Sequence, residues 1–312
     1  MNLVISFSGG ETSAYMTHRL LYGPLRSRYD QIIVLFANTG QENEQTLEFV
    51  RDCDQHFQFN AVWIESVQHH GVRKSASAKM VNFETAARNG EPFEDFIRKY
   101  GIPNQKFPSC TRDLKVNPIE NYVASLGWEH GSFDMAVGIR SDEIDRVSIN
   151  AADKNLVYPL AFWEPTTKPQ INTWWLKQPF RLKLKGYQGN CKWCWKKSPR
   201  KHFTLISETP EIYDFPRKME QLYGYVGPEF KKPGGRAPLK NGDPYRRVFF
   251  RSNLSTDELF RLYQQKKNFF VPVSDDAQTY VEFDPDMDVG AGCSESCEVY
   301  SDEDAATEEL RG

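Results

Sequence analysis

The first 65 residues alternate short apolar runs with amphipathic stretches. Apolar runs at 2–7, 31–36 and 60–65 predict three strands, and helical spacing of apolar residues at 12–22 and 42–57 predicts two helices between them. Strands separated by helices require crossover connections, which favour parallel pairing. The chain is therefore predicted to open with a βαβαβ unit of an α/β protein.

Beyond residue 65 the pattern is weaker. We expect helices at 84–100, 118–126 and 170–177, and strands at 133–139 and 156–160. The fold class that accommodates all of these elements is a doubly wound, mostly parallel sheet of Rossmann-like layering. Ligands of such sheets bind outside the carboxyl ends of the strands.

The composition changes along the chain and predicts three regions. Residues 1–180 form the α/β domain, and 181–284 form an irregular C-terminal region in which basic residues alternate with tryptophan and tyrosine. Within it, 224–243 is rich in Gly, Pro and Lys and is expected to be a linker or long loop. The acidic tail at 285–312 has few large apolar residues and is expected to be disordered.

Composition and charge exclude some classes of protein. The chain has 312 residues and a net charge of −3, which argues against a surface that is entirely a nucleic-acid or membrane footprint. No apolar run is long enough to span a membrane, and a strand beginning at Asn2 leaves no room for a signal peptide. We expect a cytoplasmic protein without a membrane partner, and the sequence does not indicate its oligomeric state.

A loop rich in serine and glycine joins the first predicted strand to the first predicted helix. Two glycines allow the backbone to approach a phosphate, hydroxyl groups add donors, and the helix N-terminus favours an anion. The loop is not a Walker A loop, which needs a lysine after its second glycine, nor a three-glycine dinucleotide fingerprint. The alternative is a simple turn. The expected phosphate-binding residues are Ser6, Ser8, Gly9, Gly10, Thr12 and Ser13.

The sequence Ser-Phe-Ser-Gly-Gly-Glu-Thr-Ser at 6–13 resembles the pyrophosphate (PP) loop of the adenine nucleotide alpha hydrolase superfamily. That superfamily includes ATP pyrophosphatases, tRNA-thiolating enzymes and phosphoadenosine phosphosulfate (PAPS) reductases. Residues 35–44 resemble its second strand and the following turn, while 109–115 and 137–143 resemble the Cys-Thr-x-x-x-Lys and Gly-Ile-Arg-x-Asp-Glu segments of the PAPS reductase-like branch. One departure is Thr12, where most ATP-using members have aspartate.

The resemblance implies that the chain binds ATP or PAPS, and that its ATP-using form cleaves at the α-phosphate and releases pyrophosphate from an adenylated intermediate. Guanidinium and ammonium groups suit a site that holds such phosphates, and a carboxylate suits the Mg²⁺ that bridges them. For any one charged residue, the alternative is an exposed ion pair. The expected further nucleotide contacts are Asn38, Thr39, Arg112 and Gly138, and the expected catalytic residues are Lys115, Arg140 and Asp142, with Glu143 as an alternative magnesium ligand.

Three cysteines are candidate metal ligands. Cys191 and Cys194 have C-x2-C spacing, which lets two thiolates reach one metal, and the resemblance implies that Cys110 lies near the same edge of the sheet. Together they could hold a [4Fe-4S] cluster, as in some tRNA-thiolating relatives, or Zn²⁺ with a fourth ligand such as His202. Reduced cysteines that only pack remain a third interpretation, and the sequence does not separate the three.

Three functions compete at this stage. The leading hypothesis is an ATP-dependent adenylating enzyme for sulfur or nitrogen transfer. The second is a thiol-dependent reductase of PAPS or adenosine phosphosulfate, which the tail around Cys293 and Cys297 does not favour because it lacks a Glu-Cys-Gly-x-His-type segment. The third is a non-catalytic nucleotide-binding or accessory protein that contacts tRNA or DNA through 181–201. For that segment, a solvated basic face with tryptophans in the core is the favoured alternative.

Overall fold

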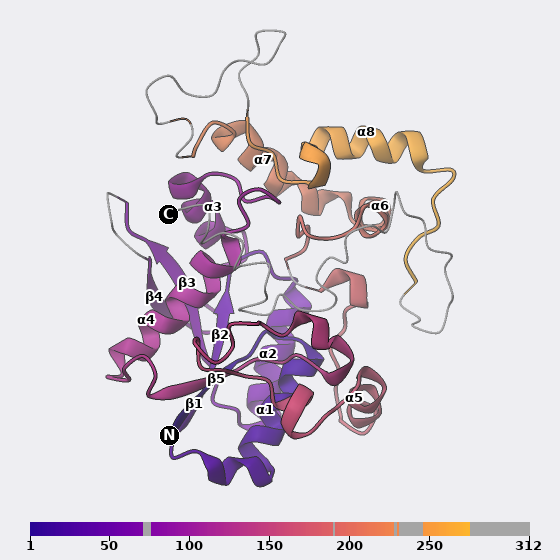
Figure 1. Ribbon diagram of the computed structural model, residues 1–312. Coiled ribbons are helices and arrows are strands. Elements are labelled where there is room, and N and C mark those ends of the chain that lie inside the picture. Colours follow the sequence, from indigo (N-terminus) through magenta and orange to yellow (C-terminus); the bar gives the residue numbers. More distant parts are fainter. Residues whose placement is uncertain (71–75, 190, 228–229, 231–245, 275–312) are drawn as a thin grey trace.

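The computed structural model describes residues 1–70, 76–189, 191–227, 230 and 246–274 (Figure 1). A six-stranded sheet with the strand order β4-β3-β2-β1-β5-β6 forms its centre, and every neighbouring pair is parallel except β3 with β4. The predicted α/β class and mostly parallel sheet are confirmed. The strands are β1 (Asn2–Ser6), β2 (Ile32–Asn38), β3 (Val62–Gln68), β4 (Ala76–Val81), β5 (Phe133–Ala136) and β6 (Leu156–Val157).

Helices cover both faces of the sheet because successive strand residues point to opposite sides. Leu3 and Ile5 of β1 join the core beneath one set of helices, and Val4 joins the core beneath another. Figure 1 shows the first set on one side of the sheet and α4 on the other. The first set is α1 (Glu11–Tyr22), α2 (Glu44–Phe57) and α5 (Lys168–Trp175), and α4 spans Asn117–Ser125.

The C-terminal part forms a second hydrophobic core with helix α3 (Glu91–Tyr100). Helices α6 (Pro199–Glu208), α7 (Asp214–Tyr223) and α8 (Thr256–Lys266) contribute to it and gather at one end of the molecule in Figure 1. The prediction of an irregular C-terminal region was therefore wrong for these segments. The core that they share is rich in aromatic side chains. The side chains of Ser198 and Ser255 cap α6 and α8, a signal that the sequence did contain.

The sequence prediction missed strand β4 and displaced several element ends. Strand β4 lies at the sheet edge with most side chains partly exposed, so its apolar alternation is weak. Helix α3 begins at Glu91 rather than at residue 84, because residues 82–90 form turns that end at Gly90. The predicted linker at 224–243 lies mostly outside the described residues, and the tail at 285–312 with Cys293 and Cys297 lies entirely outside them. Within the described part of the chain, no helix combines the length and apolar character needed to cross a bilayer.

Candidate functional site

The strand order places a switch point between β1 and β5 at the carboxyl edge of the sheet, where open α/β sheets have their ligand-binding crevice. The chain runs outward from β1 through β2 to β3, then returns to place β5 on the other side of β1. At such a switch point the loops after the two central strands diverge, and ligands of open α/β sheets bind between them. Here those loops are 7–10, after β1, and the segment that follows β5.

The loop after β1 has a backbone that only glycine accommodates at position 9. Gly9 has φ +78°, and a Cβ atom there would lie 2.7 Å from Cγ2 of Thr46 on α2. Gly10 is the N-cap of α1, so the unpaired amides of the first helical turn begin directly after it. The predicted strand, loop and helix are therefore present, and the loop packs tightly on α2.

The side chain of Ser13 shapes the loop from within. Its buried Oγ accepts from the N–H of Ser8 at 3.2 Å and from the Ser8 hydroxyl at 2.9 Å, and it donates to the carbonyl of Gly10 at 3.0 Å. These contacts use the donor of Ser13, and Ser6 is likewise buried at the end of β1. Ser13 is thus placed to hold the loop, and phosphate contact by Ser8 and Thr12 stays a prediction.

Gly138 lets the segment after β5 approach the start of α1 closely. A Cβ atom at this position would lie 3.3 Å from Cα of Ser13 and 3.5 Å from its nitrogen. A larger residue would therefore require α1 or this segment to shift by a few tenths of an ångström. The structure places this predicted residue beside the start of α1 as a backbone neighbour.

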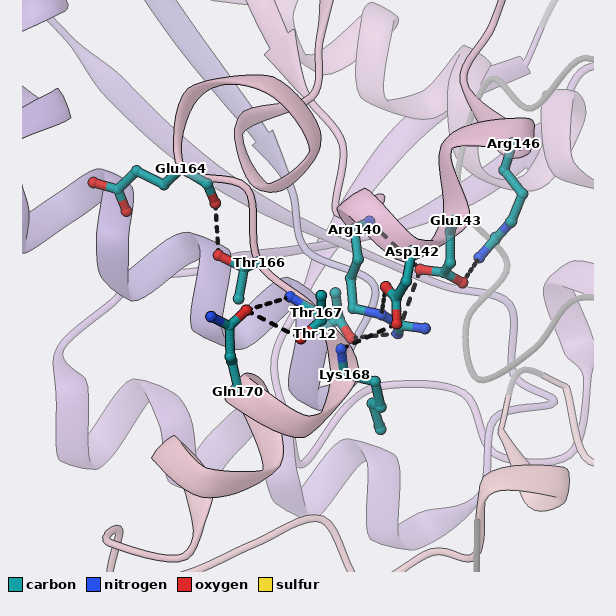
Figure 2. Close-up of polar contacts among 10 residues, drawn as sticks. All are labelled: Thr12, Arg140, Asp142, Glu143, Arg146, Glu164, Thr166, Thr167, Lys168 and Gln170. Carbon is teal, nitrogen blue, oxygen red and sulfur yellow. Dashed lines mark hydrogen bonds and ion pairs between the residues drawn. The ribbon is translucent and has the colours of Figure 1, made fainter. Parts of the chain in front are cut away.

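Arg140 connects the two loops (Figure 2). Its side chain is 9% exposed, and Nη1 donates to Oγ1 of Thr12 at 3.2 Å. Its Nε donates to Oδ1 of Asp142 at 2.8 Å, and Nη1 lies 3.3 Å from Oε2 of Glu143. Glu143 also pairs with Arg146. Three residues predicted separately from the sequence, at positions 12, 140 and 142, therefore meet at the start of α1.

The carboxylate of Asp142 is fixed on both oxygens. Oδ1 accepts from Arg140, and Oδ2 accepts from the backbone N–H of Lys168 at 3.2 Å, where the Thr167–Gln170 capping box begins α5 (Figure 2). Burial opposes ionisation, but the hydrogen bonds from Arg140 and Lys168 outweigh it and lower the pKa of Asp142. The group is thus an ionised carboxylate that orients the guanidinium. A magnesium ion would have to share it with Arg140.

Sequence reasoning missed Glu11 and Arg181, which secure the first turn of α1. The two nitrogens Nε and Nη2 of Arg181 each lie 2.9 Å from an oxygen of Glu11, and Trp175 on α5 donates from Nε1 to the Glu11 carbonyl at 3.0 Å. An acidic residue in the first turn of a helix is the signal that could have drawn attention to this pair.

Asn38 and Thr39, at the end of β2, are both used in internal hydrogen bonds. The Asn38 amide donates to Oε1 of Glu65 at 2.7 Å and to the Ala87 carbonyl at 2.9 Å. Thr39 donates from its backbone N–H and from its hydroxyl to the carboxylate of Glu42, each at 2.9 Å. The sequence did not single out Glu65, and it indicated Glu42 only as part of the segment 35–44 that resembles the superfamily's second strand and turn. Contact of residues 38 and 39 with a nucleoside stays a prediction.

The three candidate cysteines line a single pocket. Cys110, Cys191 and Cys194 share it with Thr39 and Lys115. The walls are mostly apolar and come from α3, the segment 112–116 and the C-x2-C turn, through Phe93, Leu114, Trp193 and Trp195. The structure therefore brings together the cysteines that the sequence related only through spacing and resemblance.

A π-turn explains how the helix at 110–125 contributes to this pocket. The element η2 (Arg112–Val116) is a π-turn in which the N–H of Asn117 bonds the carbonyl of Arg112, five residues back. This wider turn brings residues five apart, such as Cys110 and Lys115, onto one face, and both line the pocket. The predicted phosphate ligand Arg112 instead pairs with its buried neighbour Asp113 at 2.6 Å.

The described residues contain no preformed metal site. In that part of the chain, no group of three or more His, Cys, Asp or Glu side chains is arranged to hold a metal ion. His202, named above as a fourth zinc ligand, is buried on α6, where Nδ1 lies 2.8 Å from the hydroxyl of Tyr213. Binding of zinc or of an iron-sulfur cluster by the three cysteines stays a prediction.

The basic segment at 181–201 is divided between exposed and buried cations, with Arg181, Lys183 and Lys185 on the exposed side. Lys196, Lys197 and Arg200 are buried, and Nζ of Lys197 donates to the carbonyls of Tyr187 and Gly189 at 3.0 and 2.5 Å. The tryptophans of this segment lie in the second core, as one of the two interpretations expected. A nucleic-acid surface made by these three cations is not present in this arrangement.

The fold and the site together define an α/β protein in which a glycine-rich loop, a buried arginine and a three-cysteine pocket lie along one edge of a mostly parallel sheet. The chain is 26% identical to the uncharacterized nin region protein ORF290 of Escherichia phage lambda over 313 residues, covering 95% of this chain and 94% of that protein. It is 26% identical over 170 residues to the uncharacterized protein MJ0066 of Methanocaldococcus jannaschii, covering 54% of this chain and 28% of that protein. No protein-family model matches the chain.

Proposed function

We propose that the chain is a PAPS reductase-like enzyme that binds ATP at the loop 6–13 and cleaves it at the α-phosphate, releasing pyrophosphate. The contact between Arg140 and Thr12 carries this proposal. Through this contact a buried guanidinium from the segment after β5 lies at the N-terminus of α1. The segment after β5 and the start of α1 are on opposite sides of the switch point. An anion in this crevice would meet helix amides on one side and a charged fork on the other.

In this proposal the chain's own groups bind and neutralise the leaving pyrophosphate. The amides after Gly10 would bind phosphate oxygens, and Arg140 would stabilise the negative charge that builds up as the α-phosphate bond breaks. Asp142 would keep Arg140 oriented, since it holds Nε of the guanidinium. Magnesium held by Asp142 or Glu143 would add positive charge beside the phosphates.

The test compares two arginines that contact the same carboxylate. Arg140 and Arg146 both pair with Glu143, and Arg140 also contacts Thr12 in the loop 6–13. Calorimetric titration should show that the wild type binds ATP. Arg140→Gln should lose about tenfold or more in affinity, since a charged hydrogen-bonded contact is worth about 1.5–3 kcal/mol. Arg146→Gln should change the affinity little. Equal effects of the two substitutions, or no ATP binding by the wild type at millimolar concentration, would refute the proposal.

Reduction of PAPS is a second candidate because of the cysteine pocket. Cys110 is partly exposed in a pocket that also contains Cys191, Cys194 and Lys115, so a nucleophilic thiol and a cation are at hand. Incubation with PAPS and a thiol donor distinguishes the two functions. Sulfite release that is lost in Cys110→Ser would favour the reductase, and pyrophosphate release from ATP would favour the adenylating enzyme.

A further inference from the structure

The C-x2-C turn is attached directly to the loop that follows β2. Cys191 forms a β-bridge with Glu42, and the neighbouring Lys192 donates its backbone N–H to the Gln41 carbonyl at 2.9 Å. Trp193, between the two cysteines, donates from Nε1 to Oε1 of Gln41 at 2.5 Å. A change in the turn is therefore transmitted to the loop 39–42, at the same edge of the sheet as the crevice.

The direction of one hydrogen bond makes this attachment sensitive to the state of the thiol. Oγ1 of Thr39 lies 2.9 Å from both carboxylate oxygens of Glu42 and 3.6 Å from Sγ of Cys191. A hydroxyl has a single proton, and a carboxylate can only accept. Since the Thr39 proton goes to Glu42, the contact with Cys191 requires the S–H group as the donor. The result is a chain of donors from Cys191 through Thr39 to Glu42.

The two cysteines are placed to form a disulfide with each other. The N–H of Cys194 donates to the carbonyl of Cys191 at 3.0 Å, which closes a four-residue turn. The first and fourth Cα atoms of such a turn lie within about 7 Å, and disulfides span about 4.4–6.8 Å. Cys191 is partly exposed and Cys194 is buried, so an oxidant reaches Cys191 first.

We propose that Cys191 and Cys194 form a redox-active dithiol whose oxidation loosens the loop 39–42 and thereby weakens nucleotide binding. The effect on nucleotide rests on the function proposed above. The oxidant is an external disulfide. The Cys191 thiolate attacks it and releases one thiol, and the Cys194 thiolate then attacks the mixed disulfide and releases the second, so two electrons pass to the oxidant and both cysteines lose their protons.

Oxidation removes the S–H donor and draws Sγ of Cys191 to about 2.05 Å from that of Cys194. Thr39 then loses one of the contacts that hold it against the turn. A coupling of this kind between two sites typically changes affinity by about 5–150-fold. We expect ATP to bind at least about fivefold more weakly to the oxidised protein than to the reduced protein.

Two substitutions of Cys191 separate the thiol proton from the disulfide. Cys191→Ser keeps a donor to Thr39 but cannot form the link, so its ATP affinity should not respond to oxidised glutathione. Cys191→Ala has neither donor nor link and should resemble the oxidised wild type under all conditions. Cys53→Ser alters a fully buried cysteine on α2 and should respond like the wild type.

The experiment treats the full chain with oxidised or reduced glutathione, maps the disulfide by peptide mass spectrometry, and measures ATP affinity and amide hydrogen exchange over residues 38–43. The expected result is a 191–194 link, weaker ATP binding and faster exchange. Absence of the link, a link without change in exchange, or a metal ion that must be chelated before the link forms would overturn the inference. If neither form binds ATP, the proposed function fails, while exchange that still responds to the link supports the dithiol.

Discussion

Glu220 makes the stability of the C-terminal helices depend on pH. It is 5% exposed on α7, and its carboxylate accepts from the N–H of Phe249 at 3.1 Å and from the N–H of Thr256, at the start of α8, at 2.8 Å. Burial raises the pKa of Glu220 from 4.5 to about 7, against the opposing effect of these two backbone bonds. Folding therefore favours the protonated acid.

The sign and size of the effect follow from this pKa. Because the folded protein holds the proton more tightly, the contribution of Glu220 is complete below about pH 4.5 and is lost as the pH rises to about 7. At 1.36 kcal/mol for each pKa unit, the loss amounts to about 3 kcal/mol in the free energy of unfolding. Glu220→Gln removes the titration, so the difference between variant and wild type should change by this amount across the window.

Urea unfolding followed by tryptophan fluorescence at several pH values between 4.5 and 7.5 measures the difference. Glu220→Gln should be less stable than the wild type at pH 4.5, by about 1–2 kcal/mol, since its amide cannot accept from both backbone donors. It should lose less stability than the wild type as the pH rises. Glu258→Gln is the control, because hydrogen bonds from Ser255 lower the pKa of Glu258 and its titration falls below this window. Parallel curves for wild type and Glu220→Gln would refute the reasoning.

Two further predictions concern the phosphate loop. Gly9→Ala should destabilise the fold by about 2–4 kcal/mol, because it combines a positive φ with a clash. The control Gly127→Ala shares the positive φ (+81°) but meets no atom within 4 Å, so it should cost only about 1–2 kcal/mol. Thermal denaturation measures both variants, and equal losses of stability would contradict the clash at position 9. Thr12→Val removes the acceptor for Arg140 and should weaken ATP binding about tenfold, measured by calorimetry. The midpoint of thermal unfolding should change little. Unchanged affinity would mean that this contact does not contribute to nucleotide binding.

The part of the fold that the sequence predicted is the part with strong local periodicity. The first three strands and two helices have continuous apolar patterns, and the structure places all five within a few residues of the predicted ranges. Strand β4 was missed because an edge strand buries little. Helices α6 to α8 were missed because they are buried in a core that they share with Trp193, Phe249 and helix α3, which lies more than 90 residues earlier in the chain.

The candidate site was predictable as a set of residues, but the side-chain pairing was not. The serines and glycines of the loop can be recognised by their position after a predicted strand. The sequence does not indicate that the Ser13 side chain points into the loop or that Arg112 pairs with Asp113. The burial of Glu42 and Glu65 could not be predicted for the same reason. From sequence alone a single glutamate is predicted to be exposed, because the partner that allows its burial comes from a distant segment of the chain.

The order of the strands explains why one loop can serve both proposed sites. Strand β1 lies between β5 and β2, so the segment that follows β1 has Arg140 on one side and Thr39 on the other. A nucleotide with its phosphates at the β1/β5 crevice would place its nucleoside along the same edge of the sheet, and one of the two available directions leads toward the loop after β2. That loop is bonded through Gln41 and Glu42 to the C-x2-C turn. The two proposals together therefore couple chemistry at the thiols to occupancy of the crevice through Thr39.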